Sequence, residues 1–203
     1  MPPIEVFADV ACPFTHVGLR RFVARRDAEQ RHDVRLRVHA WPLEIVNGEP
    51  IGPDLASEEI EQLRAQVAPD LFAGFDPAAM PTTSIPAFAL VATAYRQGDD
   101  IGERVSLAVR NELFEEGHDI ADPAVLAQVA AAVGVEVPDL SDDTPARADW
   151  DAGKRRGVQG SPHYFVGGEG FFCPSLDITH VDGHLQVKAD PEEFDRFLDH
   201  ALA

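Results

Sequence analysis

In IEVFADVACPFTH, residues 4–16, a short apolar run leads directly into a cysteine followed by a proline. The run over residues 4–8 predicts a strand, and Pro13 suits the first turn of a helix. Cys12 therefore lies at a helix N-terminus, where unpaired backbone N–H groups and the helix dipole favour the thiolate. We expect Cys12 to be a reactive thiol with a lowered pKa rather than an inert, buried cysteine.

The chain around this stretch predicts a strand, a helix and a second strand. The helix is expected over residues 13–30, with apolar positions that include Val17 and Phe22. Residues 34–41 then alternate apolar and polar side chains, which is the period of a half-buried strand. Such a βαβ unit places its two strands parallel in one sheet.

The middle of the chain changes to helical patterns. Ser57 is expected to cap a helix whose apolar positions Ile60, Leu63 and Val67 share one face. Four further helices are expected at residues 84–97, 101–116, 122–134 and 142–156. Their ends are marked by glycines, and Asp122-Pro123 is a typical helix start. No segment in this block alternates like a strand, so the sequence predicts an all-helical insertion.

The C-terminal part returns to strands. Residues 163–166 and 170–173 flank Gly167-Gly168, which indicates a hairpin. A further short strand is expected at residues 185–188, after a turn at Asp182-Gly183. Asp190-Pro191 begins a final helix. Its expected buried positions are Phe194, Phe197, Leu198 and Ala201.

The order βαβ, helical block, ββα predicts the α/β class. Without its middle, the chain has the thioredoxin arrangement of a four-stranded sheet with helices, and the helical insertion lies between the second and third strands. We expect a discontinuous thioredoxin-like domain at residues 1–53 and 150–203, and an insertion domain at residues 54–149.

Charge and composition exclude several classes of function. The net charge is −18, and residues 54–149 hold 19 acidic and 5 basic residues. Nucleic acids and anionic membranes need a continuous basic face, so neither is an expected partner. No apolar run approaches the roughly 20 residues that span a bilayer, and the N-terminus lacks the features of a secretory signal. We expect a cytoplasmic protein, and two cysteines are too few for a disulfide framework.

Cys12-Pro13-Phe14-Thr15 resembles the Cys-Pro-x-Cys motif of DsbA-like thioredoxin-fold oxidoreductases. The chain is similar in particular to the FrnE-type branch and its relatives, the kappa-class glutathione transferases and 2-hydroxychromene-2-carboxylate isomerases. Residues 158–162, ending in Ser161-Pro162, resemble the loop that carries the family's cis-proline. Three more segments agree in order, at residues 42–48, 113–120 and 125–134.

The resemblance implies that Cys12 is the nucleophile, and that Pro13, Phe14, His16, Ser161 and Pro162 bind the substrate. Thr15 stands where the oxidoreductases have their second cysteine, so a dithiol mechanism is excluded and an external thiol must resolve the mixed disulfide. The Thr15 hydroxyl either donates a hydrogen bond to the thiolate or caps the helix, and both alternatives stay open.

The remaining candidate residues have less specific signals. His16 lies one helical turn after Cys12, where it either stabilises the thiolate or points elsewhere from the surface. Cys173 is expected to be a core or surface thiol rather than a resolving cysteine. The spacing of histidines and cysteines predicts no metal site.

Three functions from different classes remain. The first is a monothiol disulfide oxidoreductase acting on small disulfides and protein disulfides. The second is a glutathione-type, thiol-dependent isomerase or transferase, and the third is a non-catalytic binding protein. We expect no tightly bound cofactor. The expected partner is a low-molecular-weight thiol such as glutathione. Whether the protein forms a homodimer stays open.

Overall fold

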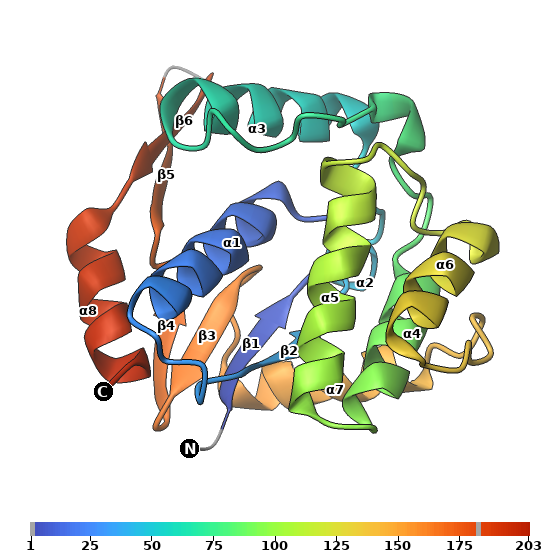
Figure 1. Cartoon of the computed structure of the whole chain (residues 1–203). Coiled ribbons are helices and arrows are strands. Elements are labelled where there is room, and N and C mark those ends of the chain that lie inside the picture. Colours follow the sequence, from blue (N-terminus) through green and yellow to red (C-terminus); the bar gives the residue numbers. More distant parts are fainter. Residues whose placement is uncertain (1–2, 182–183) are drawn as a thin grey trace.

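The first three elements form the βαβ unit that the sequence predicts. The computed structural model describes residues 3–181 and 184–203 (Figure 1). Strand β1 (Ile4–Ala8) leads into helix α1 (Pro13–Ala28), and strand β2 (Leu36–Ala40) lies parallel to β1. The short apolar run and the proline at the first helical position account for the boundaries of β1 and α1.

The main sheet is completed by the C-terminal hairpin. Strand β3 (His163–Val166) runs antiparallel to β1, and strand β4 (Glu169–Phe172) pairs with β3. Both residues of the intervening turn, Gly167 and Gly168, have positive φ angles, which glycine adopts without steric cost. The resulting order β2-β1-β3-β4 confirms the predicted thioredoxin fold.

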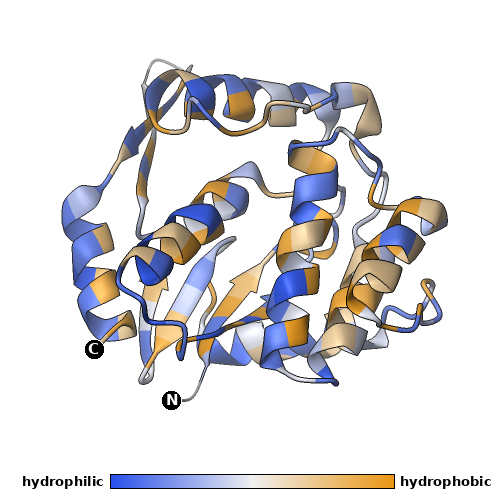
Figure 2. Ribbon diagram, in the orientation of Figure 1, coloured by the Kyte–Doolittle hydropathy of each residue, from blue (hydrophilic) through white to orange (hydrophobic). Residues whose placement is uncertain are grey.

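Every element between β2 and β3 is helical in the residues described. In chain order these are α2 (Leu43–Asn47), α3 (Pro53–Gln66), the 3-10 helix η1 (Pro77–Ala79), α4 (Ile85–Tyr95), α5 (Asp99–Phe114), α6 (Pro123–Val133) and α7 (Thr144–Arg156). Helices α4 and α6 are largely hydrophobic (Figure 2), and α4 packs against α5, α6, α7 and β2. None of the described helices combines the length and apolar character that a bilayer crossing needs.

The chain ends with a second, smaller sheet and a helix. Strands β5 (Leu176–Val181) and β6 (His184–Ala189) pair antiparallel with each other, apart from the main sheet, and β6 packs against α3. Helix α8 (Pro191–Ala201) begins at Asp190, whose side chain accepts the N–H of Glu193, as the sequence predicts.

Aromatic packing holds helices on both faces of the main sheet. On one face, the ring of Phe197 in α8 lies 5.8 Å from Phe22 of α1, 4.8 Å from Tyr164 and 5.4 Å from Phe171, between ring centroids. On the other face, a Cβ at Gly153 of α7 would lie only 2.6 Å from the ring of Trp41. The absence of a side chain at Gly153 therefore lets α7 approach the sheet closely.

Side chains from three helices close the outer edge of β2. The N–H groups of Leu36, Val38 and Ala40 point away from β1 and donate to acceptors in the helical block. The acceptors are Glu103 Oε2 of α5 at 2.6 Å, the Tyr95 hydroxyl of α4 at 2.8 Å and Asp149 Oδ2 of α7 at 2.9 Å. An edge strand that would otherwise be open is thereby fully paired along its N–H groups.

The structure corrects several predicted boundaries. Ser57 does not cap α3, because the helix begins at Pro53 and the Ser57 hydroxyl donates to the Pro53 carbonyl. Helix α2 and strand β5 were not predicted, and Cys173 follows β4 instead of ending it. The predicted turn at Asp182-Gly183 lies outside the described residues. The division into two domains stays a prediction, and its limit at 149/150 falls within α7.

Tyr95 and Tyr164 allow a matched test of the closed sheet edge. The Tyr95 hydroxyl accepts the Val38 N–H and donates to the Leu36 carbonyl, whereas the buried Tyr164 hydroxyl has no hydrogen-bond partner in the part of the chain described. We expect Tyr95→Phe to lower the free energy of unfolding by about 2 kcal/mol, because a buried N–H loses its acceptor. Tyr164→Phe should leave it unchanged or raise it, because this substitution removes a buried hydroxyl that has no partner. Urea unfolding of both variants measures the difference, and equal effects would contradict this assignment.

Candidate active site

Asp9, at the end of β1, fixes the loop that carries Cys12. Its buried carboxyl group has three hydrogen-bond donors. These are the N–H of Ala11 at 2.7 Å, the N–H of Leu43 at 2.7 Å and the hydroxyl of Ser84 at 3.2 Å. The buried guanidinium of Arg110 donates to the Asp9 carbonyl at 3.2 Å. Burial raises the pKa of Asp9, while these donors and the charge of Arg110 act in the opposite direction.

Cys12 is the N-cap residue of α1, with Pro13 in the first helical position, as the sequence predicts. The side chain is nonetheless only 3% exposed, and its thiol donates to the Ser161 carbonyl oxygen at 3.4 Å. Burial and the negative charge of Glu59 raise the pKa of Cys12 to about 11, and hydrogen bonds with Thr15 and Ser161 offset only part of this. The expected lowered pKa is therefore wrong for this closed site, in which Cys12 is a protonated thiol.

Thr15 and Ser161 meet beside the thiol. The Thr15 hydroxyl lies 2.8 Å from the Ser161 hydroxyl, which also accepts the Asp9 N–H at 2.9 Å. Thr15 is fully buried and lies inside α1, whose N-cap position belongs to Cys12. Of the two alternatives for the Thr15 hydroxyl, a contact at the thiol therefore fits its position better than a capping role.

The peptide bond between Ser161 and Pro162 is cis. Pro162 is buried, and its carbonyl accepts the N–H of Cys173 at 2.9 Å. Gly160, just before this pair, lies against Phe172, whose ring a Cβ at this position would approach to 2.8 Å. The loop thus brings a backbone carbonyl 149 residues away in sequence onto the Cys12 thiol.

His16 is buried and directed away from the thiol. Its Nε2 lies 2.7 Å from Glu115 Oε1, and its ring packs between Phe72 and Phe114, with centroids 5.3 and 5.0 Å away. Burial lowers the pKa of His16, although the hydrogen bond and the charge of Glu115 act in the opposite direction. His16 therefore points elsewhere, as one alternative held, but into the core rather than from the surface. Its ring joins α1 to the end of α5.

The remaining predicted residues divide between the site and the core. Pro13 is buried, whereas Phe14 is half-buried beside Cys12 and packs against the core. Cys173 is a buried free thiol with a φ angle of 45°, and burial raises its pKa. In the described part of the chain, no three His, Cys, Asp or Glu side chains group as a metal site would require.

Sequence reasoning missed two acidic residues at the site. Asp9 interrupts an apolar run only three residues before Cys12, and this unusual position for a carboxyl group was an available signal. Glu59 gives no such signal, because its closeness to Cys12 arises from the packing of α3 against α1. Asp9 could have been found from the sequence, whereas Glu59 required the tertiary structure.

Comparisons with known proteins agree with this architecture. A family model described as a DSBA-like thioredoxin domain matches residues 3–186. A solved 2-hydroxychromene-2-carboxylate isomerase has a TM-score of 0.61 at 16% identity, over 84% of this chain and 88% of that chain. The cytosolic disulfide reductase DsbM from Pseudomonas aeruginosa, solved with GSH, has a TM-score of 0.62 at 17% identity, over 99% of both chains. No curated protein sequence matches. At these identities the solved structures share the fold.

Replacement of Asp9 tests its role in holding the site. We expect Asp9→Ala to lower the free energy of unfolding by about 3 kcal/mol or more, because buried donors from three segments lose their acceptor. Asp139→Ala is the matched control, since the side chain of the exposed Asp139 accepts from nearby Ser141. That variant should lose less than about 1 kcal/mol. Urea unfolding measures both, and similar losses would contradict the assigned role of Asp9.

The protonated state of Cys12 predicts a distinctive pH dependence of alkylation. With the pKa of Cys12 raised to about 11, the thiolate fraction grows as pH approaches that value from below. The rate of Cys12 alkylation by iodoacetamide should therefore rise about tenfold per pH unit from pH 7 to pH 9. Peptide mass spectrometry of a Cys173→Ser variant measures this rate. A plateau below pH 8 would show instead that the helix terminus dominates over burial.

Proposed function

This chain belongs to the DSBA-like thioredoxin domain family, and we propose that it acts as a monothiol disulfide oxidoreductase. The family-level prediction is confirmed, whereas the FrnE-type branch within it stays a prediction. The observation that carries the proposal is the contact between the Cys12 thiol and the Ser161 carbonyl before cis-Pro162, with Thr15 in the place of a second thiol. The site thus holds one nucleophile and no internal partner at the usual position.

In the proposed reaction, Cys12 first loses its proton. The thiolate attacks one sulfur of a disulfide R–S–S–R′, which forms Cys12–S–S–R and releases R′–S⁻. A second thiolate, R″–S⁻, then attacks the R sulfur, which forms R–S–S–R″ and returns the Cys12 thiolate. Thr15 has no sulfur and cannot perform this second step. Each cycle therefore consumes one external thiolate, releases R′–S⁻ and leaves one disulfide, R–S–S–R″, and complete reduction of R–S–S–R′ takes two external thiols.

Glutathione is the external thiol that we propose. A fold neighbour, the cytosolic disulfide reductase DsbM, was solved with GSH, which supports a small thiol partner for a protein of this fold. The same comparison supports a cytoplasmic location, where glutathione keeps thiols reduced. Residues Phe14, Ser161 and Pro162 would then contact the bound thiol or disulfide, and protein disulfides are a further substrate class.

A thiol-dependent isomerase is the second candidate. The protonated state of Cys12 and the adjacent hydroxyls of Thr15 and Ser161 favour it, because such groups can hold and orient a bound thiol without covalent attack. A fold neighbour is a 2-hydroxychromene-2-carboxylate isomerase. In this alternative, Cys12→Ser would keep activity, whereas in the oxidoreductase it would abolish it. A wild-type protein that binds thiols without turnover, and whose binding survives Cys12→Ser, would indicate the non-catalytic alternative.

Substitutions of Cys12 and Thr15, at the start of α1, test the monothiol mechanism. We expect the wild type to form a mixed disulfide of Cys12 with oxidised glutathione, and Cys12→Ser to lose it completely, while Cys173→Ser retains it. Thr15→Cys should restore a Cys-Pro-x-Cys sequence and close an internal disulfide, so that insulin reduction by this variant no longer requires glutathione as resolving thiol. Intact-protein mass spectrometry under non-reducing conditions follows each species. Absence of a glutathione adduct on the wild type would refute the mechanism.

A further inference from the structure

The Cys12 thiol is enclosed in this structure, so part of the molecule must move before a disulfide can reach it. The side chain is 3% exposed, and the thiol donates to the Ser161 carbonyl. Attack on a disulfide requires access of the thiolate to sulfur. Beside the sheet, buried hydrogen bonds of Asp9 hold the loop that carries Cys12. The movable part therefore lies among the elements that cover the start of α1.

Helix α3 covers the start of α1. In Figure 1, β1 points toward the side of the molecule where α3 lies, and the chain turns there into α1. The two helices pack against each other and run in the same direction, and Arg21 of α1 donates to the carbonyl of Val67, directly after α3. Counted back from this contact at 1.5 Å per residue, Cys12 and Glu59 each lie about 12–14 Å toward the N-terminal end of their helix. The half-buried Glu59 therefore lies over the Cys12 end of α1.

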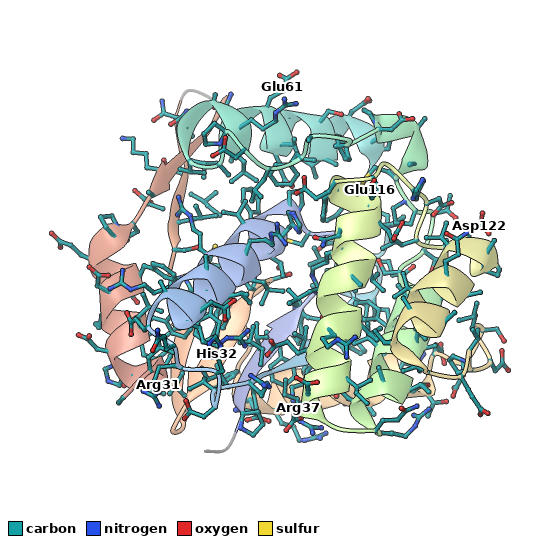
Figure 3. The ribbon with its side chains drawn as sticks, in the orientation of Figure 1. Arg31, His32, Arg37, Glu61, Glu116 and Asp122 are labelled. Carbon is teal, nitrogen blue, oxygen red and sulfur yellow. The ribbon has the colours of Figure 1, made fainter. Side chains whose placement is uncertain are left out.

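Helix α3 and the β5–β6 hairpin form one unit, which we call the α3–hairpin unit. Strand β6 packs against α3, and both strands are separate from the main sheet. The hairpin is closed at its base, where the Asp190 N–H donates to the Ser175 carbonyl at 3.2 Å. Figure 3 shows the Glu61 side chain pointing outward from α3, away from the rest of the molecule, so the unit has solvent on its outer side.

Helix α3 is attached to its neighbours by little buried surface. Its buried residues are Ala56, Ile60 and Leu63. Within the part of the chain that the structure describes, the side-chain hydrogen bonds of α3 stay inside that helix. Separating α3 from α1 therefore exposes far less apolar surface than unfolding of the whole chain, and local openings of this kind need less free energy than global unfolding.

Arg21 of α1 binds the α3–hairpin unit at both of its members. Its Nη2 donates to the Val67 carbonyl after α3 at 3.0 Å, and its Nη1 donates to the Ser175 carbonyl before β5 at 3.0 Å. The guanidinium is half-buried, and none of the described carboxylates forms an ion pair with it. The two carbonyls therefore satisfy this charged group, and hydrogen bonds to charged groups are stronger than those between neutral groups. Arg21 thus ties the unit to the active-site helix.

We propose that the α3–hairpin unit opens as a lid over Cys12, and that Arg21 is the latch that keeps it closed. The inference rests on the proposed function in taking Cys12 as the reacting group, and it adds how a substrate reaches the sulfur. Opening moves α3 away from α1, exposes the thiol to water and carries the Glu59 carboxylate away from it. Both changes favour the thiolate at a helix N-terminus. Access and reactivity therefore arise from the same movement.

Cys173 provides an internal control for local opening, because it is as buried as Cys12, with exposed fractions of 4% and 3%. It follows β4, outside the α3–hairpin unit, and its N–H donates to the Pro162 carbonyl. Iodoacetamide alkylation of both thiols is measured at pH 8 by peptide mass spectrometry, at urea concentrations below the unfolding transition. Each rate is divided by the rate of the same thiol in the unfolded protein.

We expect Cys12 in the wild type to react at least about tenfold faster than Cys173 after this correction, with a rate that rises less steeply with urea than the global unfolding constant. If both thiols react equally, with the urea dependence of global unfolding, Cys12 is reached only by unfolding and the lid is overturned. This comparison needs no variant.

Arg20 provides the matched control for the latch. It precedes Arg21, carries the same charge and is exposed. We expect Arg21→Ala to speed Cys12 alkylation about tenfold, because two hydrogen bonds that hold the closed state are lost, and Arg21→Lys to have a smaller effect. Arg20→Ala should change the rate less than about twofold. The Cys173 rate in Arg21→Ala should stay low, and an equal rise at both thiols would show general destabilisation and would overturn the latch.

The adduct of Cys12 with oxidised glutathione, measured in the same variants, separates this inference from the function on which it rests. If Arg21→Ala speeds alkylation no more than Arg20→Ala does, the latch is wrong, and the oxidoreductase function survives as long as the adduct forms. If Arg21→Ala speeds alkylation of Cys12 but neither it nor the wild type forms the adduct, the oxidoreductase function fails while the movement itself stands. Circular dichroism of each variant verifies that the helices are intact.

Discussion

The hydrogen bonds of Asp9 are the constraint on which the rest of the site depends. This buried residue at the end of β1 contacts five segments. They are the Cys12 loop, helix α2, the residue that caps α4, helix α5 and the loop before β3. The contacts are those to Ala11, Leu43, Ser84, Arg110 and Ser161. Because the carboxyl group, the carbonyl and the N–H of a buried residue all need hydrogen-bond partners, the five segments have little freedom to move independently. The sheet and the helical block therefore meet at the active site.

The architecture could be predicted because its signals are local. The strand at residues 4–8, the proline of α1, the glycine turn at 167–168 and the cap at Asp190 each report on their own neighbourhood, and all appear in the structure. Helix α2 is too short to show a period, and β5 lies in a hairpin apart from the main sheet. Such elements depend on the surfaces they pack against, which a sequence pattern does not reveal.

The pKa of Cys12 shows the same contrast between what a local sequence pattern predicts and what tertiary packing produces. A local pattern recognises the helix N-terminus and predicts a lowered pKa. The structure adds burial and the charge of Glu59, which the pattern does not contain. Together these two effects raise the pKa of Cys12. Cys12 and Ser161 were predicted as site residues and lie together, whereas Glu59 belongs to a helix 47 positions further along the chain. Tertiary packing therefore changes the pKa at a position that the sequence predicts to be a site residue.

The paired edge of β2 also restricts how this sheet can grow. Three successive outward N–H groups, on Leu36, Val38 and Ala40, already have acceptors from α5, α4 and α7. An incoming peptide or a second copy cannot add a strand there without displacing all three helices. The opposite edge is β4, where Phe172 is exposed next to the loop of Ser161. In the main sheet, a further strand can therefore be added only at β4, next to the loop that contacts Cys12.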